Sequence, residues 1–156
     1  MAKQVTKPVL ETTFRNQFDS TDPHMKALVL ASDTTFEMPS KTLFDEAYGF
    51  AKDAMPHGDT FSKVDFFDCD DFSYIFKGLI SKWYQENRPH DLPLAIGISW
   101  GLFPGFGNNE IHSMNWVIFD SGELHWIEPQ FVNGKAMHEA MRASDTSRDK
   151  LNFVLI

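Results

Sequence analysis

Cysteine is almost absent from this sequence of 156 residues, in which Cys69 is the single one. A lone cysteine forms no disulfide within the chain, so a small secreted scaffold held together by disulfides is excluded. Three roles remain for Cys69: a buried thiol, a metal ligand or a nucleophile. We expect a reducing, cytoplasmic environment.

Long apolar runs are also missing. The least polar stretch, Leu94–Gly107, is interrupted by Pro104 and several glycines, and it is shorter than the roughly 20 residues of a membrane-spanning helix. The first residues, Met1–Leu10, lack the apolar core of a signal peptide. The sequence therefore predicts no membrane segment and no membrane partner.

Basic residues are scarce: 14 lysines and arginines stand against 22 aspartates and glutamates, for a net charge of −8. Phosphate backbones repel such a charge, so we expect no nucleic-acid partner. Apolar residues are plentiful at 42%, and 15 of them are phenylalanines, enough to fill a core. At about 100–200 residues per domain, we expect a single domain over residues 1–156, with no assigned role for residues 1–60.

Two helices are predicted in the first half of the chain. Ser40 is a candidate cap for a helix that runs to about Met55, because apolar residues recur there at three- and four-residue steps. The second helix starts at or near Asp68, since Asp68 and Asp71 have the spacing of an N-terminal cap. One continuous apolar stripe then runs from Phe72 to Trp83.

The remaining elements are predicted to be mainly strands, because runs of branched and aromatic residues are bounded by turn residues. The predicted strands are Lys26–Ala31, Leu94–Trp100, Ile111–Phe119, Glu123–Glu128 and Leu151–Ile156. The loop Asp120-Ser121-Gly122 makes the third and fourth of them a β-hairpin, and Ala136–Ala143 predicts a short helix. Helices early and an antiparallel sheet late define an α+β fold.

Cys69 lies in the first turn of the second predicted helix, where free backbone N–H groups and the helix dipole stabilise a thiolate. Three neighbours oppose this effect, because the carboxylates of Asp68, Asp70 and Asp71 favour the neutral thiol. A small buried hydrophobic residue is the competing interpretation of Cys69.

A nucleophilic cysteine needs a base and a group that orients the base. If the hairpin loop has three residues, Phe119 pairs with Glu123, and Glu128 faces residue 114. Alternation of side chains then makes His112 and Glu128 diagonal neighbours on one face, with Gln130 opposite His112. A slip of one residue would separate the pair, and the simpler role of His112 is a polar residue at a strand entrance.

Three short motifs, Cys69-Asp70-Asp71-Phe72, His112 with Asn115, and Glu128-Pro129-Gln130, follow one another in the chain. In this order they resemble the papain-like cysteine-protease domain at the C-terminal end of the calcium-dependent agglutinin family of fungi, the Marasmius oreades agglutinin type. That domain also occurs in short bacteriophage and bacterial proteins. The resemblance spans about Phe67–Gln130 and implies a papain-like core over residues 61–156, with N-terminal helices packed on a C-terminal antiparallel sheet.

The resemblance assigns roles to residues. It implies that Cys69 is the nucleophile, His112 the base and Glu128 the orienting group, and that Ca²⁺ or Mn²⁺ is required. Asp70 and Asp71 are the candidate metal ligands, since these cations prefer hard oxygen donors. Asp71 has the competing role of helix cap.

Four groups are candidates for oxyanion binding or support: the backbone N–H of Cys69, Asn115, Gln130 and Trp100. Hydrogen bonding to local backbone is the alternative for Asn115 and Gln130, and a core or cleft wall is the alternative for Trp100. The glycine-rich segment 101–109 is either a mobile flap beside His112 or an ordinary connection.

The preferred interpretation is a papain-like thiol protease that hydrolyses a peptide or isopeptide bond of a protein or peptide substrate, with a divalent cation. The alternative is a non-enzymatic structural or interaction protein with an assembly partner, such as a phage virion or host-binding component, in which Cys69 is buried and His112 is far from Glu128. The expected location is the cytoplasm, which is that of the host cell if the protein is encoded by a phage, or the virion. The lectin domain that precedes the protease domain in the agglutinins has no counterpart here, so glycan recognition is not implied. A third interpretation, an acidic protein that mimics nucleic acid, would need carboxylates aligned along one face of the molecule. The acidic residues around Cys69 form too local a cluster for that.

Overall fold

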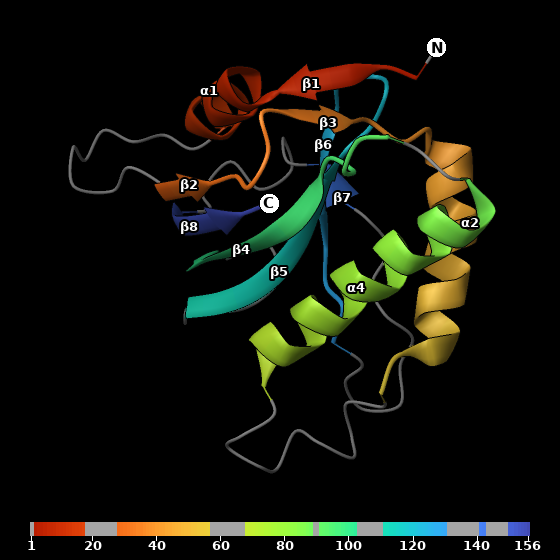
Figure 1. Ribbon diagram of the computed structural model, residues 1–156. Helices are drawn as coiled ribbons and strands as arrows, with labels where there is room; N and C mark the ends of the chain where they lie inside the picture. Colours follow the sequence, from red (N-terminus) through yellow and green to blue (C-terminus); the bar gives the residue numbers. More distant parts are fainter. Residues whose placement is uncertain are drawn as a thin grey trace.

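The computed structural model describes residues 2–17, 28–56, 68–88, 91–102, 111–130, 141–142 and 150–156. A central sheet separates two groups of elements: α1 with two short strands on one side, and α2 with α4 on the other (Figure 1). Within the described residues, no helix is long and apolar enough to cross a membrane.

The central sheet has six strands in the order β2-β8-β4-β5-β6-β7. Its strands are β2 (Leu28–Leu30), β4 (Ile96–Leu102), β5 (Ile111–Ile118), β6 (Leu124–Ile127), β7 (Met141–Arg142) and β8 (Lys150–Leu155). All neighbours pair antiparallel except β2 and β8, which run parallel. The α+β fold is therefore confirmed, with a mixed sheet in place of a purely antiparallel one.

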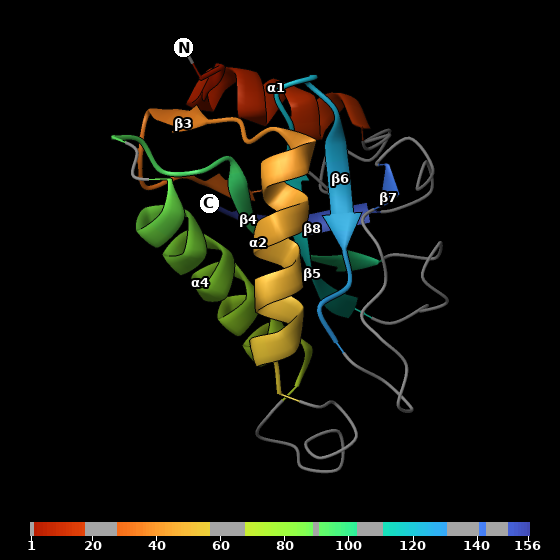
Figure 2. The same ribbon diagram turned by 90° about the vertical axis from the view of Figure 1, so that its right-hand side faces the viewer.

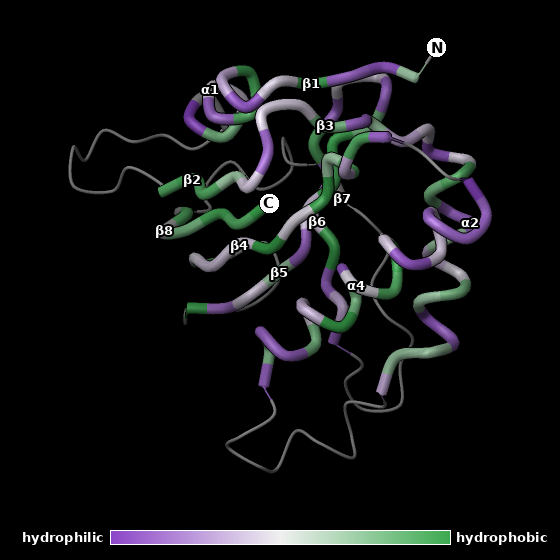
Figure 3. The backbone as a smooth tube through the Cα atoms, in the orientation of Figure 1, coloured by the Kyte–Doolittle hydropathy of each residue, from purple (hydrophilic) through white to green (hydrophobic). Residues whose placement is uncertain are grey.

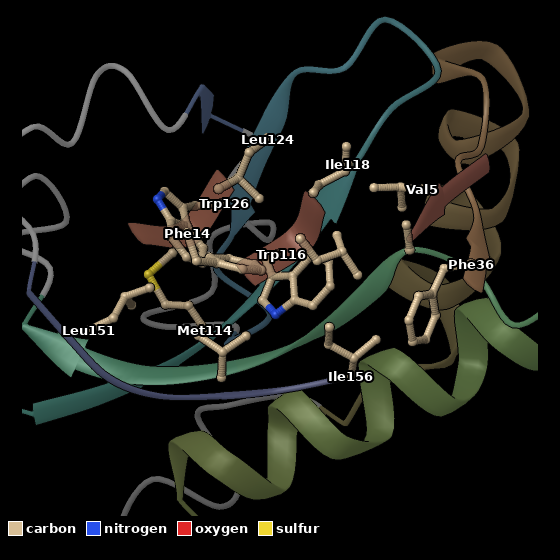
Figure 4. Packing of buried hydrophobic residues seen from close by; sticks show 13 residues of the cluster. Val5, Phe14, Phe36, Met114, Trp116, Ile118, Leu124, Trp126, Leu151 and Ile156 are labelled. Carbon is tan, nitrogen blue, oxygen red and sulfur yellow. The ribbon is translucent and has the colours of Figure 1, made fainter. Parts of the chain in front are cut away.

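One face of this sheet is covered by α1 (Lys7–Gln17) and by the antiparallel pair β1 (Gln4–Thr6) and β3 (Thr35–Glu37). Phe14 of α1 packs edge-on against Trp116, with ring centroids 4.9 Å apart, in a fully apolar core (Figure 4). Gly97 makes this packing possible, because a Cβ there would lie 2.5 Å from the indole of Trp116 and closer still to the Leu155 carbonyl oxygen.

The other face is covered by α2 (Lys41–Ala54) and α4 (Cys69–Asn87), which cross beside each other in Figure 2. Their apolar sides form a second core with β4 and β5, in which Phe44, Phe76 and Ile80 are buried. The hydropathy colours in Figure 3 show the result: both helices alternate along their length between apolar and polar residues. Burial of one stripe of each helix is what the three- and four-residue spacing predicts.

The predicted helix starts and the predicted hairpin are confirmed. Ser40 caps α2 by accepting a hydrogen bond from the backbone of Leu43. In the hairpin, Phe119 donates its backbone N–H to Glu123 at 3.0 Å, and Gly122 has the positive φ of 88° that the short loop requires. The expected register follows, since Trp116 pairs with Trp126 and Val117 with His125.

Several boundaries differ from the predictions. The strand expected at Lys26–Ala31 is β2, described over Leu28–Leu30, and its turn at residues 22–23 lies outside the described residues. The helix expected at Ala136–Ala143 is wrong at Met141–Arg142, which pair with β6 as β7, because an open edge of the sheet offers hydrogen bonds that a short helix cannot match. The rest of that helix and residues 103–109 of the glycine-rich segment also lie outside the described residues. Three elements in the unassigned N-terminal region, β1, α1 and β3, were not predicted.

Candidate functional site

The start of α4 is fixed by a capping box. The Asp68 side chain accepts from the backbone N–H of Asp70 at 3.3 Å, and the Asp71 side chain accepts from the backbone N–H of Asp68 at 3.1 Å. These bonds satisfy backbone donors that a helix start would otherwise leave free. They fix Cys69 as the first residue of the helix, and the helix runs beside β5 in Figure 1.

Polar side chains join the first turns of α4 to the sheet. The hydroxyl of Ser113 donates to the hydroxyl of Ser73 at 3.0 Å, and Ser73 donates to the Cys69 carbonyl at 3.0 Å. The Asn115 amide donates to the carbonyl oxygens of Ser73 and Gly97 at 3.0 and 3.1 Å. Because Ser73, Ser113 and Asn115 are fully buried, these bonds set the position of α4 along β5.

His112 and Glu128 meet across the open end of the β5–β6 pair. The imidazole Nε2 lies 2.5 Å from a Glu128 carboxylate oxygen, and both residues are 7% exposed. The other Glu128 oxygen accepts from the backbone N–H of Gln130 at 2.9 Å. The predicted diagonal contact is therefore confirmed, and the large separation expected for an interaction module is wrong, because the three-residue loop keeps the strands in register.

Cys69 belongs to the same group, since its side chain is close enough to His112 to raise the pKa of the imidazole. Burial alone would lower the pKa of His112, but the hydrogen bonds with Cys69 and Glu128 and the charge of the Glu128 carboxylate outweigh burial and raise the pKa to about 10. At neutral pH the imidazole is therefore a cation held by a carboxylate. Cys69 itself is only partly buried, so the fully buried thiol expected for an interaction module is also wrong.

The carboxylates of Asp68, Asp70 and Asp71 form a compact acidic cluster in which one oxygen atom of each lies within 4.8 Å of the others. A hydrogen bond with the Asp68 side chain, partial burial and the charges of Asp68 and Asp71 together raise the pKa of Asp70 to about 6. Asp70 and Asp71 therefore lie together, as predicted, and Asp71 also has the predicted role of cap.

The other predicted support residues lie in different environments. Asn115 is bonded to backbone carbonyls, as its alternative interpretation predicts. Gln130 touches the site through its backbone N–H. Trp100 is partly buried, and its ring packs against Tyr74 at 6.1 Å and Phe153 at 5.1 Å between centroids.

Two residues of the site were missed in the sequence. Ser73 falls at the position four residues after Cys69, and Ser113 directly follows His112. Polar residues next to predicted site residues on an otherwise apolar face are a usable signal, but serine is too common for the signal to be specific.

The comparisons with known proteins define the class of this protein. Residues 36–133 match the family described as agglutinin C-terminal, which is well over half of the chain. The chain therefore belongs to the agglutinin C-terminal family, as its motifs suggested. A search of curated proteins found no match.

Two solved structures share the fold. The PSL1a-E64 complex has a TM-score of 0.67 at 19% identity, over 98% of this chain and 50% of that one. Polyporus squamosus lectin bound to the human-type influenza-binding epitope Neu5Aca2-6Galb1-4GlcNAc has a TM-score of 0.61 at 19% identity, over 98% of this chain and 49% of the lectin. The chain spans about half the length of each.

These comparisons contradict the prediction that the protein is a thiol protease or another hydrolase. The structural relatives are described as a lectin with a bound glycan and as a PSL1a complex, and neither is described as a hydrolase. The alternative, a non-enzymatic interaction protein that keeps the fold, agrees with them better. Placing cysteine, histidine and glutamate together is a geometric result, and it does not by itself establish turnover.

Proposed function

We propose that this protein is a non-enzymatic binding domain, and that it holds its partner at the surface beside the first turns of α4. The observation that carries the proposal is a set of large apolar side chains left in solvent at that place. Tyr74 is 48% exposed and Ile111 is 64% exposed, while Trp100 of β4 is half-buried with its ring 6.1 Å from that of Tyr74. We call Tyr74, Trp100 and Ile111 the exposed patch.

The exposed patch lies next to the polar junction of α4 and β5. Tyr74 follows Ser73, which is bonded to Ser113. Ile111 precedes Ser113 by two residues, so alternation along β5 places both on the α4 side of the sheet. Exposed apolar groups beside buried polar ones are typical of protein-binding surfaces, where tyrosine and tryptophan supply contact area with little loss of side-chain entropy.

The class of partner follows from this surface. Because the chain matches only half of the lectin, the glycan of that lectin is not carried over to this chain. A protein or peptide segment with apolar side chains fits the exposed patch.

Peptide selection tests the proposal. Peptides selected from a display library against the wild-type protein are expected to bind about 30-fold more weakly to Tyr74→Ser and Ile111→Ser, which corresponds to about 2 kcal/mol per interface anchor. Val9→Ser is the matched control, because Val9 is 53% exposed on α1, across the sheet. The Cys69→Ser variant should bind as the wild type does.

Two results would contradict the proposal. Cleavage of the selected peptide by the wild type but not by Cys69→Ala, followed by mass spectrometry, would show an enzyme. Saturable binding of a sialylated glycan that Tyr74→Ser leaves intact would show a glycan partner at another surface.

A divalent cation is part of the same proposal. Three clustered carboxylates offer the hard oxygen donors that Ca²⁺ and Mn²⁺ prefer. After a hydrogen bond with Asp68 and partial burial, the charges of Asp68 and Asp71 contribute to the raised pKa of Asp70. Asp70 and Asp71 would hold the ion, which would neutralise the helix start beside Cys69.

Calorimetric titration with CaCl₂ and MnCl₂ tests the cation site. The wild type should bind one ion and melt at a higher temperature, by the linkage between ligand binding and folding. Asp70→Asn should lose at least tenfold in affinity, whereas Asp45→Asn on α2, whose carboxylate pairs with Lys41, should not. Equal loss in both variants would show nonspecific attraction to an acidic protein.

A further inference from the structure

A second site lies further along α4 than the acidic cluster and the exposed patch, at the C-terminal half of the helix. There the second half of the helix, β3, the start of β4 and the end of the chain enclose a pocket of about 180 Å³. Its apolar wall is formed by Phe36, Pro93, Leu94 and Ile156. Phe36 and Ile156 belong to the apolar core of the first sheet face, and Figure 4 shows both beside α4.

The helix supplies the polar wall. Lys77, Ser81 and Gln85 follow one another at four-residue steps, so they form one stripe along α4 that faces the pocket. Ser32 lies on the other side, where its hydroxyl donates to the Asp33 carboxylate at 2.9 Å.

Lys77 is the unusual member of this stripe. Its side chain is partly buried, and within the described residues no carboxylate lies within ion-pair distance of it. Burial lowers the pKa of Lys77, and no nearby charge offsets that effect. Lys82, on the outer side of the same helix, is exposed and paired with Glu86 at 3.1 Å.

A partly buried ammonium group without a counter-charge is unfavourable unless something else compensates it. An apolar cavity of about 150 Å³ holds one benzene molecule, so this pocket has room for a ligand with one ring of that size. Its shape therefore combines a small apolar volume with one cation at its polar wall.

We propose that this pocket binds a small organic monocarboxylate, whose apolar body packs against Phe36, Leu94 and Ile156 and whose carboxylate pairs with the Lys77 ammonium group. The hydroxyl of Ser81, one helical turn further, is placed to donate to the same carboxylate. The proposal is independent of the exposed patch, because no pocket residue belongs to that patch.

Benzoate is the probe. Benzyl alcohol has the same ring but no charge, and acetate has the carboxylate but no ring. Titrations followed by ¹H–¹⁵N NMR should show saturable binding of benzoate to the wild type, with shifts at α4 residues 77–85 and at the end of β8. Benzyl alcohol and acetate should each bind at least tenfold more weakly.

The variants separate charge from shape. Lys77→Met should lower the affinity for benzoate at least tenfold and leave that for benzyl alcohol unchanged, whereas Lys77→Arg should retain benzoate binding. Ser81→Trp, which fills the pocket without touching the charge, should abolish binding of both compounds. Lys82→Met is the matched control and should bind benzoate within twofold of the wild type.

The proposal fails if benzoate and benzyl alcohol bind the wild type equally, if benzoate shows no saturation up to 10 mM, roughly the weak limit of a specific small site, or if Lys82→Met loses as much as Lys77→Met. Loss of binding in Lys77→Met is interpreted only alongside an unchanged amide spectrum outside the pocket. Ser81→Trp provides the independent check if that spectrum changes.

Discussion

The two halves of α4 contact the same sheet by different chemistry. The first turns, from Cys69 to Ser73, reach β5 through hydrogen bonds of Ser73 with Ser113 and Asn115. The second half packs through Phe76, Ile80 and Tyr84 into the apolar core shared with α2. Apolar packing holds the helix on the sheet but tolerates small shifts, whereas hydrogen bonds require one position, so the polar half determines where the site residues lie.

The largest expected effect is in the apolar half. Phe76→Ala removes a fully buried ring between α4 and Tyr48 of α2. Truncation of such a ring costs about 3–5 kcal/mol of unfolding free energy, measured by urea denaturation. Tyr74→Ala, two residues away and exposed, should cost less than 1 kcal/mol, roughly the size of a surface change. A similar loss of unfolding free energy in both variants would mean that the buried ring of Phe76 stabilises the fold no more than the exposed ring of Tyr74.

An intermediate effect is expected from the ion pair of the polar half. Glu128→Gln removes one of the two groups that raise the pKa of His112 and should cost about 2 kcal/mol at pH 7. Glu123→Gln is the control, because its contact with His125 is longer, at 3.7 Å, and partly exposed. Equal losses in the two variants would show that burial of the His112 pair does not matter.

The pH dependence of stability follows from the same pair. The folded pKa of His112, about 10, lies above the unfolded value of about 6.5. The stabilisation is therefore complete below about pH 6.5 and is lost as the pH rises towards 10. Unfolding free energies measured at pH 6, 8 and 9.5 should fall steadily in the wild type and much less in Glu128→Gln. If the unfolding free energies of the two proteins fell in parallel with pH, a group other than His112 would be responsible for the pH dependence.

The smallest expected effect is in the serine contact. Ser73→Ala leaves the buried Ser113 hydroxyl without its acceptor and should cost about 1 kcal/mol. Removing both hydroxyls in Ser73→Ala/Ser113→Ala should cost less than the sum of the two single variants. Strict additivity would show that the contact does not couple α4 to β5.

Much of the site could be predicted because its signals are local. The capping spacing at Asp68 and Asp71 gives the start of α4, and the three-residue loop ending at Gly122 gives the register that brings Glu128 to His112. Side-chain alternation then needs no tertiary information. The parallel pairing of β2 with β8 had no such signal, because it joins segments more than a hundred residues apart.

Helix α1 shows a different limit. Leu10 and Phe14 have helical spacing and are fully buried, but Lys7 and Pro8 at its start offer no side-chain cap. Its stability comes from packing on Trp116 and not from local propensity. A short helix held by tertiary contacts is difficult to predict from one sequence for that reason.

The function was harder to predict from the sequence than the fold or the site. The motifs correctly indicated the agglutinin C-terminal family, but the hydrolase inferred from them disagrees with the described structural relatives. One fold hosts several functions, so motif order and fold narrow the class without choosing among its members.

The sequence by itself determined the two capped helices, the hairpin register and the contact of His112 with Glu128, since each depends on spacing within one or two adjacent elements. Only the tertiary structure decided which polar groups are buried. Ser73 and Ser113 become a contact because β5 passes under α4. Lys77 becomes a partly buried cation because the end of the chain closes the pocket beside it. Burial depends on what packs against a residue, and that partner is distant in sequence.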